Sequence, residues 1–513
     1  MEGLKRTGKF SCPASGPSLE PDHAAVEIHL QPALRPRHRD AGAEQIVLAV
    51  PVLRHRPRDD EPRLATSLSG INGIFSGHSV AREDPVFRLP SNAASAHIRT
   101  MPEPDSPAPR LASLDALRGF DMFWIVGGGS LHGAMKTMGD SWAARIFTDQ
   151  LDHAKWEGFH FYDLVFPMFV FIAGVSLALS LPRRVAQYGR AAESERAAEL
   201  QAAGCNLHYD GQDGHIWQRC FEEGFGSYDW RIMSDAEKRE HGRAAAARNL
   251  ILRAVILFVI GVLFSGGLNK GLDGVRWLGV LQRIALASLG AGLLSLWLGT
   301  RSLAIACGML LLGYWALLAF VPMPGGTPGD LREGHNLVNW FDSQFLPGRK
   351  YDRDHDPEGI LSTIPAIANC ILGVLAGIFL RTTRAEGSRK SLLLVGGGTA
   401  LLALGLLWSV PFPMIKKLWT SSFVLFACGC SAILLGAFHQ IIEVRNMRAW
   451  AAPFIWIGLN PITIYLAAKF VNFNQLADSF VGPKPGLLHA AVATGFGVLL
   501  AWWLHRRKIY LRV

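Results

Sequence analysis

Apolar runs about as long as a lipid bilayer is thick constrain this 513-residue chain more than any other feature. Each run holds roughly 17–25 residues, the length that an α-helix needs to cross a hydrocarbon core. Helices of this kind satisfy all their backbone hydrogen bonds within lipid. We expect about ten spans, at 114–135, 160–182, 250–266, 276–298, 302–321, 364–380, 391–410, 419–442, 452–470 and 486–504. The sequence therefore predicts an all-α, polytopic integral membrane protein embedded in the bilayer, and not a set of soluble domains.

The first 110 residues differ in composition from the rest. They contain 14 of the 28 prolines, together with clusters of arginine and little periodicity, which is typical of disorder. They do not show the basic start, apolar core and cleavage site of a signal peptide. Because Met101 directly precedes the first apolar run, we expect 1–110 to be a dispensable disordered extension or an artefact of the assigned start. Residues 111–513 should form one transmembrane domain, with a loop insertion at 183–249.

The net charge of +9 indicates an orientation in the membrane and not a nucleic-acid partner. Excess basic residues gather at helix ends on one side, notably at Arg183, Arg381 and Arg506. By the positive-inside rule these ends, both termini and the 183–249 loop are predicted to be cytoplasmic. The loops at 136–159 and 322–363 then lie outside, and both are rich in titratable side chains.

The seven cysteines show no zinc-binding or redox spacing. Most lie in apolar segments, where a free thiol behaves as a small hydrophobic group. Cys205 and Cys220 share one loop and are able to pair, although a reducing compartment favours free thiols. No metal site is expected.

Three charged residues open the first apolar run. Asp115, Arg118 and Asp121 recur at a spacing of three and therefore share roughly one helix face. Charges at a membrane boundary are costly unless they are paired or hydrated. Two interpretations remain open: an ion-pair cluster that holds helices together, or a cytoplasmic mouth that binds a charged ligand.

The outer loop at 136–159 contains a candidate general base, His153. Imidazole titrates near neutral pH, so it can accept a proton under working conditions. Asp152, Glu157 or Asp163 would be close enough in sequence to orient it. Asp163 suits the role of a helix cap equally well, and a histidine in a surface loop is ordinary by itself.

Several motifs follow one another in a specific order. They are LDALRGFD at 114–121, HAKWEG at 153–158, DLVFPMFVFIAG at 163–174, GVLQR at 279–283, DPEGILSTI at 356–364 and GLNPITIY at 458–465. Over about residues 110–505 this ordered set resembles the heparan-α-glucosaminide N-acetyltransferase family of transmembrane acyltransferases, in its bacterial branch. Two features depart from the family: Gly129 stands where an Asn is frequent, and the 183–249 loop is longer than usual.

The resemblance implies an acyltransferase of the bacterial inner membrane. An acetyl or related acyl group would pass from cytoplasmic acetyl-CoA to an extracytoplasmic saccharide, by N- or O-acylation. The proposed catalytic histidine of the family corresponds to His153, which either takes a proton from the acceptor or briefly carries the acyl group itself. A homodimer is also a reasonable expectation from the family.

The chemistry of such a reaction suggests candidate roles for other residues of the sequence. The catalytic group would comprise His153, Asp152 and Asp163. Binding of acetyl-CoA would fall to Arg118, Asp115, Gln282, Arg283 and Asn460, and binding of the acceptor to Trp156, Glu157, Asp356 and Glu358. Plainer roles stay open, because Asp356 and Glu358 suit the start of a helix and Asn460 precedes a proline that breaks one.

A transporter or exporter of small solutes is the main alternative function. Intramembrane charges and a broken helix would suit a translocation path. Matching halves with equivalent broken helices would favour transport, and the sequence shows no convincing repeat of that kind.

Overall fold

The computed structural model divides the chain into two units, 1–99 and 100–513. It describes residues 111–138, 141–203, 205, 207–210, 215–222, 226–265, 271–483 and 486–510. The predicted disordered extension, 1–110, lies outside these described residues.

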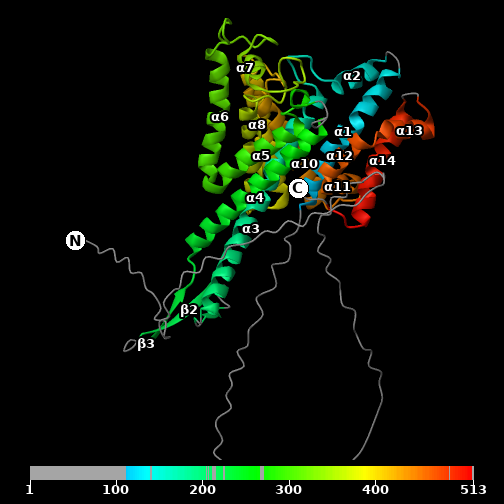
Figure 1. Cartoon of the computed structure of the whole chain (residues 1–513). Coiled ribbons are helices and arrows are strands. Elements are labelled where there is room, and N and C mark those ends of the chain that lie inside the picture. The colour runs from blue at the N-terminus through cyan, green and yellow to red at the C-terminus, as the bar shows by residue number, and fades with distance from the viewer. Residues whose placement is uncertain are drawn as a thin grey trace, which may run out of the picture. The chain divides into compact units, whose positions relative to one another are not determined.

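The described part of the chain is a helical bundle with one small sheet. In order, the elements are α1 (Ala112–Lys136), α2 (Trp142–Gln150), η1 (Phe161–Asp163), α3 (Val165–Ala202), β1 (Leu207–Asp210), β2 (His215–Glu222), β3 (Gly226–Arg231), α4 (Asp235–Phe264), η2 (Leu272–Gly274), α5 (Val280–Trp297), α6 (Thr300–Phe320), α7 (Leu337–Phe345), α8 (Thr363–Thr382), α9 (Gly387–Trp408), α10 (Ser421–Phe438), η3 (His439–Val444), α11 (Ala452–Leu459), α12 (Pro461–Phe470), α13 (Phe473–Val481) and α14 (Leu487–Arg506). Figure 1 shows how these helices pack side by side.

Eight helices in the described residues are long and apolar enough to cross a membrane. They are α3, α4, α5, α6, α8, α9, α10 with η3, and α14. The prediction of an integral membrane protein with many helical spans is therefore confirmed. Two of the ten expected spans are not among the eight: the first corresponds to α1, which carries charged residues, and the ninth is divided into α11 and α12 at Asn460.

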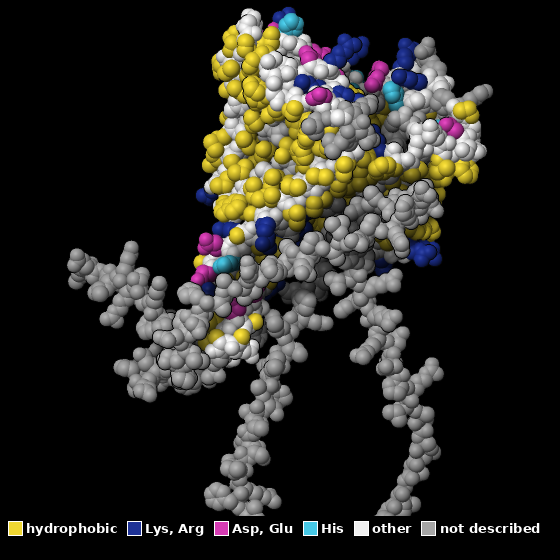
Figure 2. Space-filling view, viewed as in Figure 1, with side chains coloured by type: hydrophobic (Ala, Val, Ile, Leu, Met, Phe, Trp, Pro, Cys, Tyr) yellow, Lys and Arg dark blue, Asp and Glu magenta, His cyan; other side chains and the backbone are white. Residues whose placement is uncertain are grey.

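An apolar band crosses the face of the bundle shown in Figure 2, with charged side chains gathered above and below it. Large apolar side chains on α4, α6 and α9, such as Leu263, Met309 and Leu407, are exposed in the bare protein. A patch of this extent marks a surface that another apolar medium covers. Lipid is that medium here, because the same helices have the length and composition of membrane spans.

Two glycines allow α1 and α11 to touch backbone to backbone. A Cβ atom added to Gly119 would lie 1.7 Å from the carbonyl oxygen of Phe454, and one added to Gly458 would lie 1.8 Å from that of Asp115. Small residues are the usual means of close helix contact within membranes. This contact brings the LDALRGFD and GLNPITIY motifs together.

The predicted loop at 183–249 is largely a helical hairpin. α3 and α4 continue past the bundle as neighbours, and β1, β2 and β3 form an antiparallel sheet at the hairpin's end (Figure 1). A bond of 2.7 Å between Lys238 Nζ and Glu193 Oε2 joins the two helices. The sequence predicted a helical fold without this sheet, so the sheet is an addition to the expected architecture.

Candidate active site

His153, Asp163 and Lys416 form a compact polar cluster beside the start of α3. His153 Nδ1 lies 2.8 Å from Asp163 Oδ1 and 2.9 Å from Lys416 Nζ, which itself lies 3.0 Å from Asp163 Oδ1. Asp163 is fully buried, whereas the side chain of His153 is 52% exposed. The cluster therefore holds one edge of the imidazole and leaves much of the ring accessible.

Asp163 combines the two roles that its sequence position suggested. Its Oδ2 accepts hydrogen bonds from the backbone N–H groups of His160, at 3.0 Å, and Ala154, at 3.2 Å. The His160 bond belongs to the capping box of η1. The same carboxylate orients His153 through Oδ1, so capping the helix and orienting the histidine are not alternatives here.

The contacts of Nδ1 determine which nitrogen of His153 is available. Nδ1 faces an acceptor, Asp163 Oδ1, and a donor, the ammonium of Lys416. In the tautomer with the proton on Nδ1, the ring donates to Asp163 and Nε2 presents a lone pair, whereas in the other tautomer Nδ1 accepts from Lys416. The ring of Tyr162 lies beside the imidazole, with centroids 5.0 Å apart. Tyr162 in turn packs against α1 at Gly128 and places its hydroxyl 3.4 Å from the carbonyl oxygen of Trp124.

Lys416 was missed by the sequence analysis. It comes from the short loop before α10, which joins the His153 loop through a bridge between Glu157 and Ile415 and through a bond of 2.9 Å from Gly158 N to Met414 O. Burial lowers the pKa of Lys416, and the charge of Asp163 opposes that shift. One signal was present in the sequence: Lys416 and Lys417 lie in the loop at 411–418, which by the same alternation of spans is predicted to be outside, where the positive-inside rule disfavours lysine.

The other predicted residues of the His153 loop make different contacts. Asp152 Oδ1 accepts from the backbone N–H of His153 at 2.9 Å and does not contact the ring. Trp156 donates its indole N–H to the carbonyl oxygen of Leu331 at 3.0 Å. Glu157 is exposed. The structure thus brings His153 and Asp163 together and leaves Asp152 in a backbone contact.

Asp356 and Glu358 face an arginine that the sequence analysis did not identify. Arg276 donates to both oxygens of Asp356, at 2.7 and 2.8 Å, and to Glu358 Oε2 at 2.6 Å. Burial opposes ionisation of Asp356, but Arg276 holds the pKa of that carboxyl below its usual range. Burial raises the pKa of Glu358. Both carboxylates are buried and bound to Arg276, which organises the loop before α8.

Gln282 and Arg283 lie in the bundle interior, as predicted. Arg283 is fully buried, stacks over the ring of Trp419 at 4.8 Å, and donates through Nη2 to Ser362. Its Nε and Nη1 groups, and the Nε2 of Gln282, find no hydrogen-bond partner among the residues that the structure describes. Such buried donors can bind an additional polar group.

Arg118 is engaged in contacts between helices. Its guanidinium donates to Asp115 at 2.8 Å, to the carbonyl oxygen of Gly458 at 3.1 Å and to Ser176 Oγ at 2.7 Å. These bonds join α1, α11 and α3, as the ion-pair interpretation expects. Asn460, at the break between α11 and α12, donates to the carbonyl oxygen of Ile509 at 3.0 Å.

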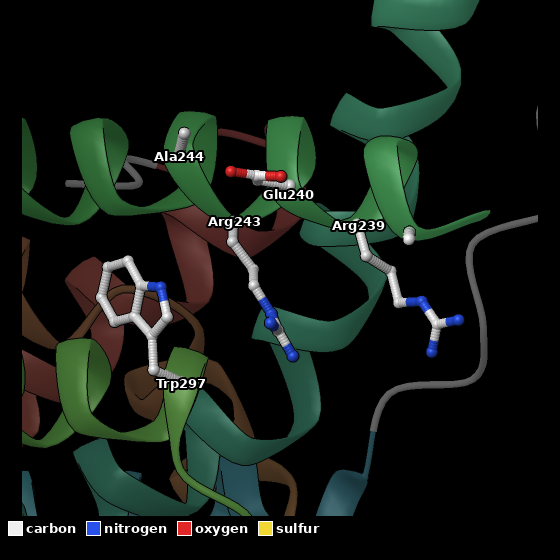
Figure 3. Close-up of a pocket in the computed structure, with 6 residues that line it drawn as sticks. Arg239, Glu240, Arg243, Ala244 and Trp297 are labelled. Atoms are coloured by element: carbon white, nitrogen blue, oxygen red, sulfur yellow. The ribbon is translucent and has the colours of Figure 1, made fainter. Parts of the chain in front are cut away.

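A separate basic cavity lies between α4 and the end of α5. It measures about 570 Å³ and is lined by Ala236, Arg239, Glu240, Arg243, Ala244 and Trp297 (Figure 3). The lining residue Trp297 ends α5, whereas Arg276 precedes the start of that helix. The cavity therefore lies at the opposite end of α5 from the Arg276 cluster, and it includes none of the predicted site residues.

Comparison with known proteins gives two distant relatives, and no family model matches the chain. Heparan-alpha-glucosaminide N-acetyltransferase from Homo sapiens is 26% identical over 470 residues, which cover 79% of this chain and 60% of the human protein. The protein of the same name from Mus musculus is 24% identical over 527 residues, covering 88% of this chain and 69% of the mouse protein. The match thus spans less than two thirds of the human relative.

Proposed function

We propose that this chain, a distant homologue of heparan-alpha-glucosaminide N-acetyltransferase, is a membrane acyltransferase. It would move an acetyl or related acyl group from cytoplasmic acetyl-CoA to an extracytoplasmic saccharide. The observation that carries the proposal is the His153 cluster: an accessible imidazole held at Nδ1 by a buried carboxylate. That arrangement is the one general acid–base catalysis requires.

The direct route uses His153 as a general base. Nε2 accepts the proton of an acceptor hydroxyl or amine as that atom attacks the thioester carbonyl. The C–S bond breaks, and the departing thiolate takes the proton from Nε2, so the imidazole returns to its neutral form. In the two-step route Nε2 itself attacks the carbonyl, and the acyl group then passes from the ring to the acceptor.

Asp163 and Lys416 support either route without touching the reacting atoms. Asp163 stabilises the positive ring that forms when Nε2 gains a proton. Lys416 balances the charge of the buried carboxylate between turnovers, since an unpaired buried charge is costly. Both are positioning residues.

The acyl donor would approach from the side where Arg118 lies. Arg118 and Gly128, which packs under Tyr162, are ten positions apart on α1, so the donor must reach about 15 Å along the helix. Arg283 and Gln282 fit a donor site because their buried N–H groups lack partners among the described residues. Arg118 fits less well, since its guanidinium already serves three acceptors.

Sealed membrane vesicles of known orientation test the proposal. Labelled acetyl-CoA supplied on the cytoplasmic face should yield label on a saccharide at the opposite face. His153→Ala should abolish this transfer at normal protein levels, whereas His335→Ala, an exposed histidine of another outer loop, should leave it intact. Equal transfer by wild type and His153→Ala would rule out the proposed mechanism.

A second pair of variants separates the two neighbouring aspartates. Asp163→Asn should lower kcat by about 10²–10⁴-fold, because the ring loses its carboxylate partner. Asp152→Asn should change kcat little, since the Asp152 carboxylate accepts from the backbone N–H of His153 and not from its ring in the described structure. Similar losses in both variants would contradict the assigned role of Asp163.

A further inference from the structure

A second polar cluster lies in the loops between α6 and α8, outside the site described above. It contains Glu333, Asp352 and His355, whose ligand atoms lie within 4.8 Å of one another. His355 Nε2 is 3.6 Å from Glu333 Oε1 and 3.6 Å from Asp352 Oδ2. His355 is only 3% exposed, and its Nε2 has no hydrogen-bond partner among the described residues.

The other ring nitrogen of His355 is already engaged. Nδ1 lies 2.8 Å from Asp354 Oδ1, so a proton on Nδ1 is donated there, and in the neutral ring the Nε2 lone pair is then directed at the two carboxylates. The turn that holds these residues is tight: Asp352 N donates to the carbonyl oxygen of His355 at 3.1 Å. Histidines that bind metals usually donate their second nitrogen to a carboxylate in this way.

A lone pair facing two carboxylates is unfavourable unless a cation lies among them. Lys417 partly supplies that cation: its Nζ lies 2.7 Å from Glu333 Oε1 and 3.0 Å from Asp352 Oδ2. An ammonium group only donates hydrogen bonds, and none to Nε2 is present in the described structure. The ammonium therefore serves the carboxylates and leaves the buried imidazole nitrogen without a partner.

We propose that Glu333, Asp352 and His355 form a binding site for a divalent transition-metal ion, with Zn²⁺ as the ion that fits best. One imidazole and two carboxylates are a ligand set that zinc accepts, with a water in the fourth position. Ligand atoms about 2.0–2.2 Å from a tetrahedral zinc lie roughly 3.4 Å apart. The distances of 3.6 Å from Nε2 to each carboxylate oxygen are close to that value.

Metal binding would displace the ammonium of Lys417, and this lysine is next in sequence to a residue of the His153 cluster. Lys417 also lies 5.7 Å from the ring centre of Trp156, and the preceding residue, Lys416, contacts His153 and Asp163.

This proposal differs from the expectation of no metal site that the sequence supports. That expectation rested on the spacing of the cysteines, and this cluster contains no cysteine.

Metal titration of the purified full-length protein in detergent, after removal of bound metal with a chelator, tests the proposal. Wild type should bind one equivalent of Zn²⁺ saturably, and Co²⁺ should give a visible absorption band typical of low coordination. His355→Gln and Asp352→Asn should weaken binding at least tenfold, and Asp354→Asn about tenfold through the ring orientation. Lys417→Met should strengthen it, because a competing cation is removed.

The matched control is His335→Gln, an exposed histidine of the same loop region that lies outside the cluster. It should bind Zn²⁺ as wild type does. The proposal is wrong if wild type shows no saturable equivalent, or if His355→Gln binds as tightly as His335→Gln. It is also wrong if Lys417→Met leaves the affinity for Zn²⁺ unchanged, because that variant keeps every ligand and removes the ammonium that competes with the metal ion. None of these outcomes depends on acyl transfer.

Discussion

Asp342, on α7, is a buried carboxylate whose ionisation opposes folding. Its Oδ1 accepts from the backbone N–H of Ile360 at 2.9 Å, whereas Oδ2 finds no partner among the described residues. Burial raises the pKa of Asp342 to about 6. The folded state therefore binds this proton more tightly than the unfolded state, and the resulting stability is lost as pH rises through 6.

Replacing Asp342 by Asn should remove that pH dependence. Between pH 4 and pH 8 the free energy of unfolding of wild type should fall by about 3 kcal/mol relative to that of Asp342→Asn. This amount corresponds to the rise of about two units in the pKa of Asp342 on folding. The variant should therefore unfold at a higher temperature than wild type at pH 8, by an amount that shrinks toward pH 4. Parallel unfolding midpoints across this range would show that the carboxylate is not the cause.

The side-chain contacts of the candidate site were predictable where the two residues are close in sequence. His153 and Asp163 lie ten residues apart, and their pairing was a stated expectation. Lys416 is 253 residues from Asp163, and Arg276 is 80 residues from Asp356, so only the packing of helices reveals these contacts. The local pattern identified the acidic groups but not the cations that bind them.

At the level of elements, α1 offers a matched pair of glycines. Gly119→Ala should destabilise the protein by at least about 1–3 kcal/mol, because its Cβ would meet the backbone of α11. Gly129→Ala should be neutral or slightly stabilising, since no atom of the described residues lies within 4 Å of the added Cβ and alanine favours a helix. Thermal unfolding of both variants in detergent measures the difference. Equal midpoints would contradict the close contact of α1 and α11.

Helix positions followed from apolar periodicity, and the break at Asn460 followed from Pro461. The sheet at the end of the α3–α4 hairpin was not predicted from the sequence. Its strands flank residues 211–214, with the sequence Gly-Gln-Asp-Gly, which is a turn signal. Beyond the membrane spans α3 and α4 are rich in charged residues and contain no apolar run, so the sequence predicts a loop where the structure has a helical hairpin.

For the whole molecule, the central expectation is that the His153 cluster and the α3–α4 hairpin face opposite sides of the membrane. Single cysteines in an otherwise cysteine-free background test it. Thr327→Cys, in an exposed loop that is predicted to be outside, should react with an impermeant maleimide in intact cells, and Glu195→Cys, exposed on the hairpin, only after permeabilisation. Reaction of both residues in intact cells would overturn the predicted orientation.

Lys416 and Lys417 are adjacent residues that reach two different polar clusters. The Cα atoms of the two lysines are therefore one peptide unit, about 3.8 Å, apart. One short loop therefore supplies a cation both to the His153–Asp163 cluster and to the Glu333–Asp352–His355 cluster.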